Sequence, residues 1–463
     1  MNPIYSIYRN IRTLSIAAIL VSSAVTLVPG VLAQQPPDAE EFYENGVEDV
    51  NDGDYEEAIE EFDQAIQLDP NYAAAYVHRG FAREALGDQE GAFADYNQAV
   101  QLDPTYANAY FNRGRIFYSQ GEEQQALADF DQAIQNDRRY AAAYLYRGII
   151  QADAEDYQGA LQDYSRAIEL RPDYAEAFVR RGAVHLAQDQ MRAAIADFDQ
   201  AIELNPNYGE AYLNRGTAYY RIGNQQTAIA DFDRAIALDD TSATAYYNRG
   251  IALSNANDPE GALADFDRAV QLDPEYTQAY FSRGVMRAAL GESQAALEDF
   301  NRVLLVDADF APAYKERGDL RLELGDAEGA ITDYTEALVI QPDYAEAYSG
   351  RANARIALGD DGGASQDYGR VISLNPTSAQ AFESRAEIRS NRGDVQGALE
   401  DYTQAIRSNP QDADSYYSRG QIKLRQGDRQ GAIYDFQQAA DLYLQQGRAD
   451  GYRNVLTEIN RLR

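Results

Sequence analysis

Small and aromatic residues recur along the chain with a period of 34 residues. When each repeat is numbered from its first residue, glycine or alanine occupies position 8 twelve times in succession, from Gly46 to Gly420, without an insertion. Alanine occupies position 20 of every repeat, and tyrosine or phenylalanine occupies positions 4 and 24. This uninterrupted pattern predicts twelve repeats between Ala39 and Gln446.

Each repeat is predicted to contain two helices. Most repeats have a glycine at position 15 and a proline at position 32, and between them apolar residues recur with helical spacing, as in Ala58, Phe62 and Ala65. The glycine ends the first helix, and the proline follows the second. Small residues at positions 8, 20 and 27 let the two helices approach closely. Because one repeat cannot bury its apolar face alone, neighbouring repeats must stack into a continuous core.

The order aromatic, Gly, Ala, aromatic, Ala and Pro at these spacings resembles the tetratricopeptide repeat, and the resemblance covers residues 39–446. Position 7 departs from the family pattern, because it holds arginine where the family usually has leucine; this variant resembles a bacterial branch of the family. The resemblance implies an all-α fold, a right-handed superhelical solenoid of helix–turn–helix repeats. It also implies a concave groove, lined by the first helices, that holds partner peptides or domains.

The two ends of the chain have different expected roles. Residues 447–463 contain apolar residues on one helical face and arginines elsewhere, which predicts a helix that caps the last repeat. At the other end, Arg9 and Arg12 precede an apolar run over residues 14–32 that ends beside Ala33. This layout predicts a secretory signal over residues 1–33, cleaved after Ala33 and followed by a linker over residues 34–38.

The alternative interpretation of residues 1–33 is an uncleaved anchor helix, since the apolar run is almost long enough to span a bilayer. Contact with a membrane is expected only in that case. Both interpretations place the remaining chain outside the cytoplasm, in the periplasm or cell envelope or as a secreted protein.

Composition narrows the class of partner. The formal net charge is −35, with 75 acidic and 40 basic residues, so the surface repels phosphate backbones and nucleic acid is not an expected partner. A basic protein or peptide, or one held by apolar contacts, is easier to accommodate. The chain has no cysteine, which excludes disulfides and thiolate metal sites.

The sequence contains no constellation expected of an enzyme. The two histidines, His78 and His185, occupy different repeat positions, and no nucleophile elbow or phosphate-binding glycine loop is present. The segment 51–54 faintly resembles a calcium loop, but it lacks the full ligand series and the closing glutamate, and an interhelix turn explains the same residues. We therefore expect no catalysis, metal or cofactor. The leading hypothesis is a protein-binding scaffold, and the alternative is a structural spacer or assembly component of the cell envelope.

Charged residues also follow the repeat. Position 7 is arginine and position 23 is aspartate in repeats two to twelve, whereas the first repeat has Asn45 and Glu61. Pairing each acid with the arginine 18 residues later leaves no acid over and recruits Arg453 in the cap. The predicted structural ion pairs between repeats include Glu61–Arg79, Asp95–Arg113, Asp265–Arg283, Asp401–Arg419 and Asp435–Arg453. The alternative is that these arginines line a ligand groove.

The resemblance also implies which first-helix positions face the groove, namely 2, 5, 9 and 12. Several of these positions are apolar or aromatic early and midway along the array. The candidate partner-binding residues are Phe111, Tyr118, Leu145, Val179, Leu213, Tyr220, Tyr247 and Phe281. An exposed apolar surface of this kind indicates a contact site, but the same residues would also serve to pack neighbouring first helices together.

Overall fold

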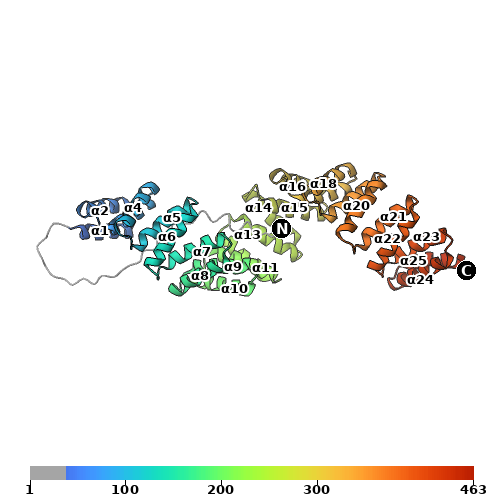
Figure 1. The fold of residues 1–463 in the computed structure, drawn as a ribbon, viewed down its shortest axis with the longest axis horizontal. Coiled ribbons are helices and arrows are strands. Elements are labelled where there is room, and N and C mark those ends of the chain that lie inside the picture. Colours follow the sequence, from blue (N-terminus) through green and yellow to red (C-terminus); the bar gives the residue numbers. More distant parts are fainter. Residues whose placement is uncertain (1–37, 463) are drawn as a thin grey trace. The chain divides into compact units, whose positions relative to one another are not determined.

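The computed structural model describes residues 38–462, and this part of the chain forms 25 helices without a strand. The predicted signal over residues 1–33 and most of the linker lie outside the described residues. The chain divides into two compact segments at Thr241 and Ser242, here called the N-terminal and C-terminal segments. In Figure 1 the helices follow one another in pairs, and each first helix begins 34 residues after the previous one.

The N-terminal segment contains six helix pairs. The first helices of its pairs are α1 (Ala39–Asp52), α3 (Ala73–Ala85), α5 (Ala107–Ser119), α7 (Ala141–Asp153), α9 (Ala175–Ala187) and α11 (Gly209–Arg221). The second helices are α2 (Tyr55–Leu68), α4 (Gln89–Leu102), α6 (Glu123–Asn136), α8 (Tyr157–Leu170), α10 (Met191–Leu204) and α12 (Gln225–Leu238).

The C-terminal segment contains six further pairs and a last helix. Its first helices are α13 (Ala243–Asn255), α15 (Thr277–Ala289), α17 (Ala311–Glu323), α19 (Ala345–Ala357), α21 (Ala379–Asn391) and α23 (Ala413–Arg425). Its second helices are α14 (Pro259–Leu272), α16 (Ser293–Val306), α18 (Ala327–Ile340), α20 (Asp361–Leu374), α22 (Val395–Ser408) and α24 (Arg429–Gln445), and the chain closes with α25 (Ala449–Leu462).

The turn between the helices of a pair requires a left-handed residue at position 15. Glycine supplies it in most pairs, as at Gly359 with φ 78°. Glu155, Asp189 and Asn257 occupy the same position in three pairs and adopt φ 62° there. The fold therefore imposes this turn even where the residue carries a side chain, at a small cost in backbone strain.

The core of each pair is built from one small residue facing one aromatic ring. A Cβ atom added to Gly284 would lie 2.8 Å from Cε1 of Phe300, and the ring of Phe300 is fully buried. The same contact recurs in other pairs, for example between Gly148 and Tyr164. Position 8 thus has room only for a small residue, which is alanine at Ala352 and Ala386, because a larger side chain would displace the ring.

Within each segment, the first helices lie nearer to one another than the second helices do. Adjacent first helices, such as α7 and α9 or α17 and α19, are in direct contact, whereas adjacent second helices have fewer contacts in the described residues. The first helices therefore form the inner side of each stack. We call the side chains at positions 2, 5, 6, 9 and 12 of these helices the first-helix face.

A helix is present where the cap was expected. Helix α25 packs against α24, burying Val455 and Ile459 beside Leu442 and Tyr443. Helix α24 is three residues longer than the other second helices, with 17 residues instead of 14, which extends the apolar surface that α25 covers. Among residues 38–462, no helix has both the length and the apolar composition needed to cross a membrane.

Candidate partner-binding face

The arginine at position 7 pairs with the aspartate of its own helix pair, 16 residues later, and not with the acid of the preceding pair. Arg283 donates from Nε and Nη2 to the two oxygens of Asp299, at 3.0 and 2.5 Å, in a bidentate contact. The predicted register is therefore wrong. Positions 7 and 23 are equally far from the turn at position 15, so an antiparallel helix pair places them side by side.

The same correction applies along the array. Asp95 pairs with Arg79, Asp265 with Arg249, Asp401 with Arg385 and Asp435 with Arg419, each at 2.5–2.7 Å, so none of the five predicted acid–arginine pairs forms. The aspartates at position 23 are almost completely buried, and bidentate guanidinium contacts satisfy them.

The third arm of most of these arginines does connect neighbouring pairs, but it reaches position 25. Arg385 is an exception, because position 25 of the preceding pair is Gly369, which has no side-chain acceptor. Nη1 of Arg147 donates to Asp131 at 2.7 Å, and Nη1 of Arg113 donates to the side-chain oxygen of Asn97 at 2.9 Å. The arginines are thus consumed by the scaffold, which argues against the alternative that they line a ligand groove. One arginine bridges two successive pairs through acceptors placed 16 residues before and after it.

The two chain ends, on which the predicted 18-residue pairing was based, do not follow it. Glu61 lacks the arginine that its own pair should supply, because position 7 is Asn45, and its Oε2 is buried without a hydrogen-bond partner among the described residues. At the other end, the Arg453 side chain is 73% exposed and pairs with Asp450 in the next turn of α25. Asp435 is instead shared by Arg419 and Lys423, at 2.7 and 2.8 Å.

Three of the eight candidate groove residues belong to the core. Phe111, Leu145 and Val179 are buried, so they do not offer the exposed surface expected of them. The ring of Phe111 lies 4.8 Å from that of Tyr140 and 5.9 Å from that of Phe130. The side chain at position 5 lies between aromatic residues at positions 24 and 34. This is the packing role that the sequence analysis gave as the alternative to partner binding.

The other candidate residues are partly buried. Tyr247 packs against Phe266 and Tyr276, and Phe281 packs against Phe300 and Phe310, with ring centroids 5.0–6.1 Å apart. Among the candidates, Tyr118, Leu213 and Tyr220 are also half-buried on the first-helix face. These five candidates therefore keep only part of their surface open to a partner.

Two charged clusters lie on the first-helix face of the N-terminal segment, and sequence reasoning missed both. In the first, Nη2 of Arg115 lies 3.1 Å from Glu84, which also accepts a 3.1 Å hydrogen bond from the hydroxyl of Tyr96. The Arg115 guanidinium lies 6.0 Å from the ring centroid of Phe111. One carboxylate and one guanidinium thus pair beside aromatic rings in a largely desolvated setting.

The second cluster, here called the Arg180 cluster, consists of Glu176, Arg180 and Glu210. Arg180 is only 7% exposed, and its Nη1 donates to Glu210 at 3.2 Å. Nη2 lies 3.7 Å from an oxygen of Glu176, and Nε has no hydrogen-bond partner among the described residues. Burial raises the pKa of Glu176, an effect that the Arg180 charge partly offsets.

Tyrosines surround this cluster. Tyr118 and Tyr146 are in edge contact at 6.2 Å, and the guanidinium of Arg171 lies 3.1 Å from the ring centroid of Tyr174. The charge of Arg180 acts on the pKa values of Tyr118 and Tyr208, which burial raises. A clue was available in the sequence, because arginine occurs only once at position 6, as Arg180, and only once at position 9, as Arg115.

The first-helix face of the C-terminal segment is more acidic. Lys315 lies 2.8 Å from Asp319, which accepts a 2.5 Å hydrogen bond from the hydroxyl of Tyr334. Further along, burial and the charges of Asp412, Asp414 and Glu387 raise the pKa of Glu383 to about 7. Asp414 is itself held by Arg448 at 2.7 Å, which lowers its pKa.

Glu383 therefore makes stability depend on pH. Its folded-state pKa lies above the ordinary glutamate value, so the folded protein binds the extra proton and the free energy of unfolding falls as pH rises from about 4.5 to about 7. We expect Glu383→Gln to raise the melting temperature at about pH 8 and to leave it unchanged at about pH 5. Because the group is half exposed, the gain should be about 1 kcal/mol.

Circular dichroism melts at the two pH values measure this effect, with Glu336→Gln on the exposed surface of α18 as the charge-matched control. A gain of equal size at both pH values would contradict the role of Glu383.

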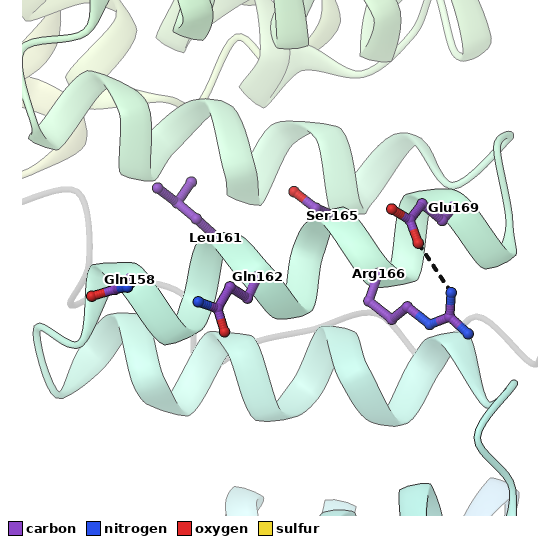
Figure 2. Close-up of a pocket in the computed structure, with 6 residues that line it drawn as sticks. All are labelled: Gln158, Leu161, Gln162, Ser165, Arg166 and Glu169. Atoms are coloured by element: carbon purple, nitrogen blue, oxygen red, sulfur yellow. Dashed lines mark hydrogen bonds and ion pairs between the residues drawn. The ribbon is translucent and has the colours of Figure 1, made fainter.

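The outer face of the second helices has fewer features that could bind a partner. Figure 2 shows an open depression of about 500 Å³ whose side chains all come from α8, with a 3.0 Å ion pair between Arg166 and Glu169 at one end. The depression is lined by Gln158, Leu161, Gln162, Ser165, Arg166 and Glu169. Because the depression is open and its side chains come from a single helix, this surface serves as a comparison for the first-helix face.

The histidines have ordinary surroundings. His78 lies within 3.3 Å of the Tyr43 hydroxyl and 3.0 Å of the Ala74 carbonyl, and burial lowers its pKa. Nδ1 of His185 lies 2.7 Å from Gln190. Throughout residues 38–462, no three carboxylate or histidine side chains come together in a way that could hold a metal ion.

The sequence matches models of a known protein family. Models described as tetratricopeptide repeats match residues 48–87, 85–121, 107–140, 152–189, 179–243, 243–276, 318–359 and 387–427, which together span more than half of the chain. The chain belongs to the tetratricopeptide repeat family. Members of this family generally mediate protein–protein interactions.

Solved tetratricopeptide structures resemble parts of the chain. The crystal structure of MamA is 27% identical, covering 36% of this chain and 96% of its own, with a TM-score of 0.34. YrrB, described as having an unusual peptide-binding site, is 24% identical over 40% of this chain and 95% of its own, with a TM-score of 0.35. Yeast Tom70 is 17% identical over 92% of this chain and 95% of its own, with a TM-score of 0.37. No curated protein matches the chain in sequence.

Proposed function

We propose that this tetratricopeptide repeat protein is a non-enzymatic scaffold that holds a partner peptide or protein domain on the first-helix face of its N-terminal segment. Family membership supports protein binding in general. The observation that favours this face is the Arg180 cluster, because stacking of the repeats does not require, at position 6, a buried arginine whose Nε has no hydrogen-bond partner among the described residues.

The chemistry of the face suits a protein partner. Half-buried tyrosines provide large contact areas with a polar end, and they lie beside charges that are already largely removed from water. The outer face of α8 lacks both features (Figure 2). A partner bound on the first helices would add contacts without competing with the arginine–aspartate pairs that hold the scaffold.

Site-specific photo-crosslinking tests this assignment. A photoreactive phenylalanine analogue replaces Tyr118 on the first-helix face or, as the control, Gln162 on the outer face of α8. With envelope extract, we expect a discrete partner to be cross-linked from position 118 and not from position 162. A stoichiometric partner that is cross-linked from position 162 alone, or from neither position, would contradict the proposed face.

The same experiment separates the proposal from the alternative function. A structural spacer would hold other envelope parts through its ends or through the whole solenoid. It would retain no discrete stoichiometric partner on the first helices.

The proposed location is outside the cytoplasm. The support is the sequence layout of residues 1–33, in which Arg9 and Arg12 precede an apolar run that ends beside Ala33. Mass spectrometry of the protein recovered from cells is expected to find Gln34 as the first residue. Recovery of envelope-bound protein that retains Met1 would favour the anchor interpretation instead.

A further inference from the structure

The Arg180 cluster has more hydrogen-bonding capacity than the structure uses. A guanidinium has five N–H donors, yet Arg180 makes one hydrogen bond among the described residues, from Nη1 to Glu210. Its Nε is buried and has no hydrogen-bond partner within residues 38–462, and the residue as a whole is only 7% exposed. Leaving a buried charged donor unsatisfied is costly, so such a group in a folded protein calls for an explanation.

The two carboxylates of the cluster, Glu176 and Glu210, can in turn accept further hydrogen bonds. Glu176 lies 3.7 Å from Nη2 of Arg180, which is too long for a strong hydrogen bond. The side chains of Glu176 and Glu210 are 26% and 32% exposed, so a partner can reach them. A group that completes the cluster must therefore accept a hydrogen bond from Arg180 and bring a positive charge to the two carboxylates.

Two other arginines illustrate how a cation is held in this part of the fold. Arg115 on the first-helix face pairs with Glu84 beside Phe111, and the guanidinium of Arg171, which follows α8, lies 3.1 Å from the ring centroid of Tyr174. Carboxylates and aromatic rings together thus hold guanidinium groups of the chain itself. Tyr118 and Tyr208, whose pKa values respond to the Arg180 charge, provide the aromatic part beside the Arg180 cluster.

We propose that the Arg180 cluster binds a basic side chain of an extended partner peptide, with the cation placed against Glu176 and Glu210 and a neighbouring peptide carbonyl accepting from Arg180. This inference rests on the proposed function and specifies the chemistry of the partner. The net charge of −35 supports it, since such a surface attracts a basic segment over long range. A carboxylate ligand is disfavoured, because Glu176 and Glu210 would repel it.

Fluorescence anisotropy with the full-length chain tests the proposal. The probe is a labelled octapeptide of alternating arginine and alanine, and the matched probe carries citrulline, which keeps the shape and loses the charge. We expect the arginine peptide to bind at physiological ionic strength and the citrulline peptide to bind at least tenfold more weakly. Equal binding of the two peptides would overturn the proposal.

Charge-matched variants show whether binding is local. Glu176→Gln and Glu210→Gln should each weaken binding of the arginine peptide at least fivefold, whereas Glu203→Gln on the exposed end of α10 should leave it unchanged. Because every variant removes one negative charge, equal weakening by all three would indicate diffuse attraction and overturn the site. Each single variant leaves Arg180 one carboxylate, and circular dichroism confirms that the helices remain folded.

Failure of this inference differs from failure of the proposed function. If a protein partner is still cross-linked from position 118 while Glu176→Gln has no effect on the arginine peptide, the face binds a partner of other chemistry. If position 118 yields no partner, the face itself is wrong.

Discussion

Replacing Asp299 with alanine is expected to lower the free energy of unfolding of the surrounding helices by about 3–5 kcal/mol. Asp299 is 2% exposed and accepts hydrogen bonds from Arg283 at 2.5 and 3.0 Å and from Arg287 at 2.9 Å. Its loss leaves two guanidinium groups in a largely dry interface without their main acceptor. Removing one member of a buried pair is more costly than replacing both with apolar residues of similar volume, because the remaining charge is uncompensated.

Hydrogen exchange of α15 and α16, together with denaturant unfolding, measures this loss, since long repeat arrays do not always unfold in two states. The control is Asp267→Ala, which removes a 2.6 Å contact to Arg283 from a side chain that is 44% exposed and should cost less than about 1 kcal/mol.

A double-mutant cycle distinguishes the observed register from the predicted one. Arg283 and Asp299 should show strong coupling, whereas Arg283 and Asp265 should be nearly additive, because Asp265 is bound by Arg249. Strong coupling between Arg283 and Asp265, with additive effects for Arg283 and Asp299, would instead support pairing between successive helix pairs.

Replacing Phe130 with alanine should have an effect of similar size, about 3–5 kcal/mol, through packing alone. The ring is fully buried, and its centroid lies 5.9 Å from Phe111 and 5.7 Å from Tyr146. It also fills the space beside Gly114, where a Cβ atom would lie 2.9 Å from Cε1 of Phe130. Backbone that already touches the ring has little freedom to collapse into the cavity.

Thermal and denaturant unfolding measure this change, with Ile222→Ala as the control because Ile222 is 53% exposed at the end of α11. A loss below about 1 kcal/mol for Phe130→Ala would show that the neighbouring repeats relax into the space.

The helix pairs could be predicted from the sequence because their signals are local and repeated. Glycine at position 15 and small residues at positions 8 and 20 each have a backbone or packing requirement that only one or two residue types satisfy. The turns at Glu155, Asp189 and Asn257 carry no such signal, yet the period places them correctly. The 34-residue period thus predicts these turns even where the residue at position 15 is not glycine.

The ion-pair register could not be predicted by the same reasoning. Arginine and aspartate recur with the same period, so spacings of 16 and 18 residues fit the interior of the array equally well. Only the chain ends distinguish them, because the spacing of 16 leaves Glu61 without an arginine whereas the spacing of 18 does not. The structure leaves Glu61 with a buried, unpartnered oxygen, which shows that one end residue is weak support for a register.

The candidate site was hidden for a related reason. The apolar position 5 recurs along the chain and so stands out in the sequence, but its residues Phe111, Leu145 and Val179 are needed for stacking. Arg180 and Glu176 break the pattern of their columns, and nothing in a linear chain brings them together with Glu210, which is 30 residues away from Arg180. Features that the scaffold repeats hold it together, whereas single departures mark the open face.

The placement of acceptors 16 residues before and after most of these arginines bears on how such a gene can change in length. An in-frame loss of the codons for residues 107–140 would join Tyr106 directly to Ala141. Arg147 would keep Asp163 ahead of it and would meet Asn97 in place of Asp131 behind it, again an oxygen acceptor. Misaligned recombination between neighbouring repeats of this kind therefore yields a chain in which the arginine still has an acceptor on each side. The number of repeats can then change by whole repeats, and the first-helix face becomes longer or shorter with it.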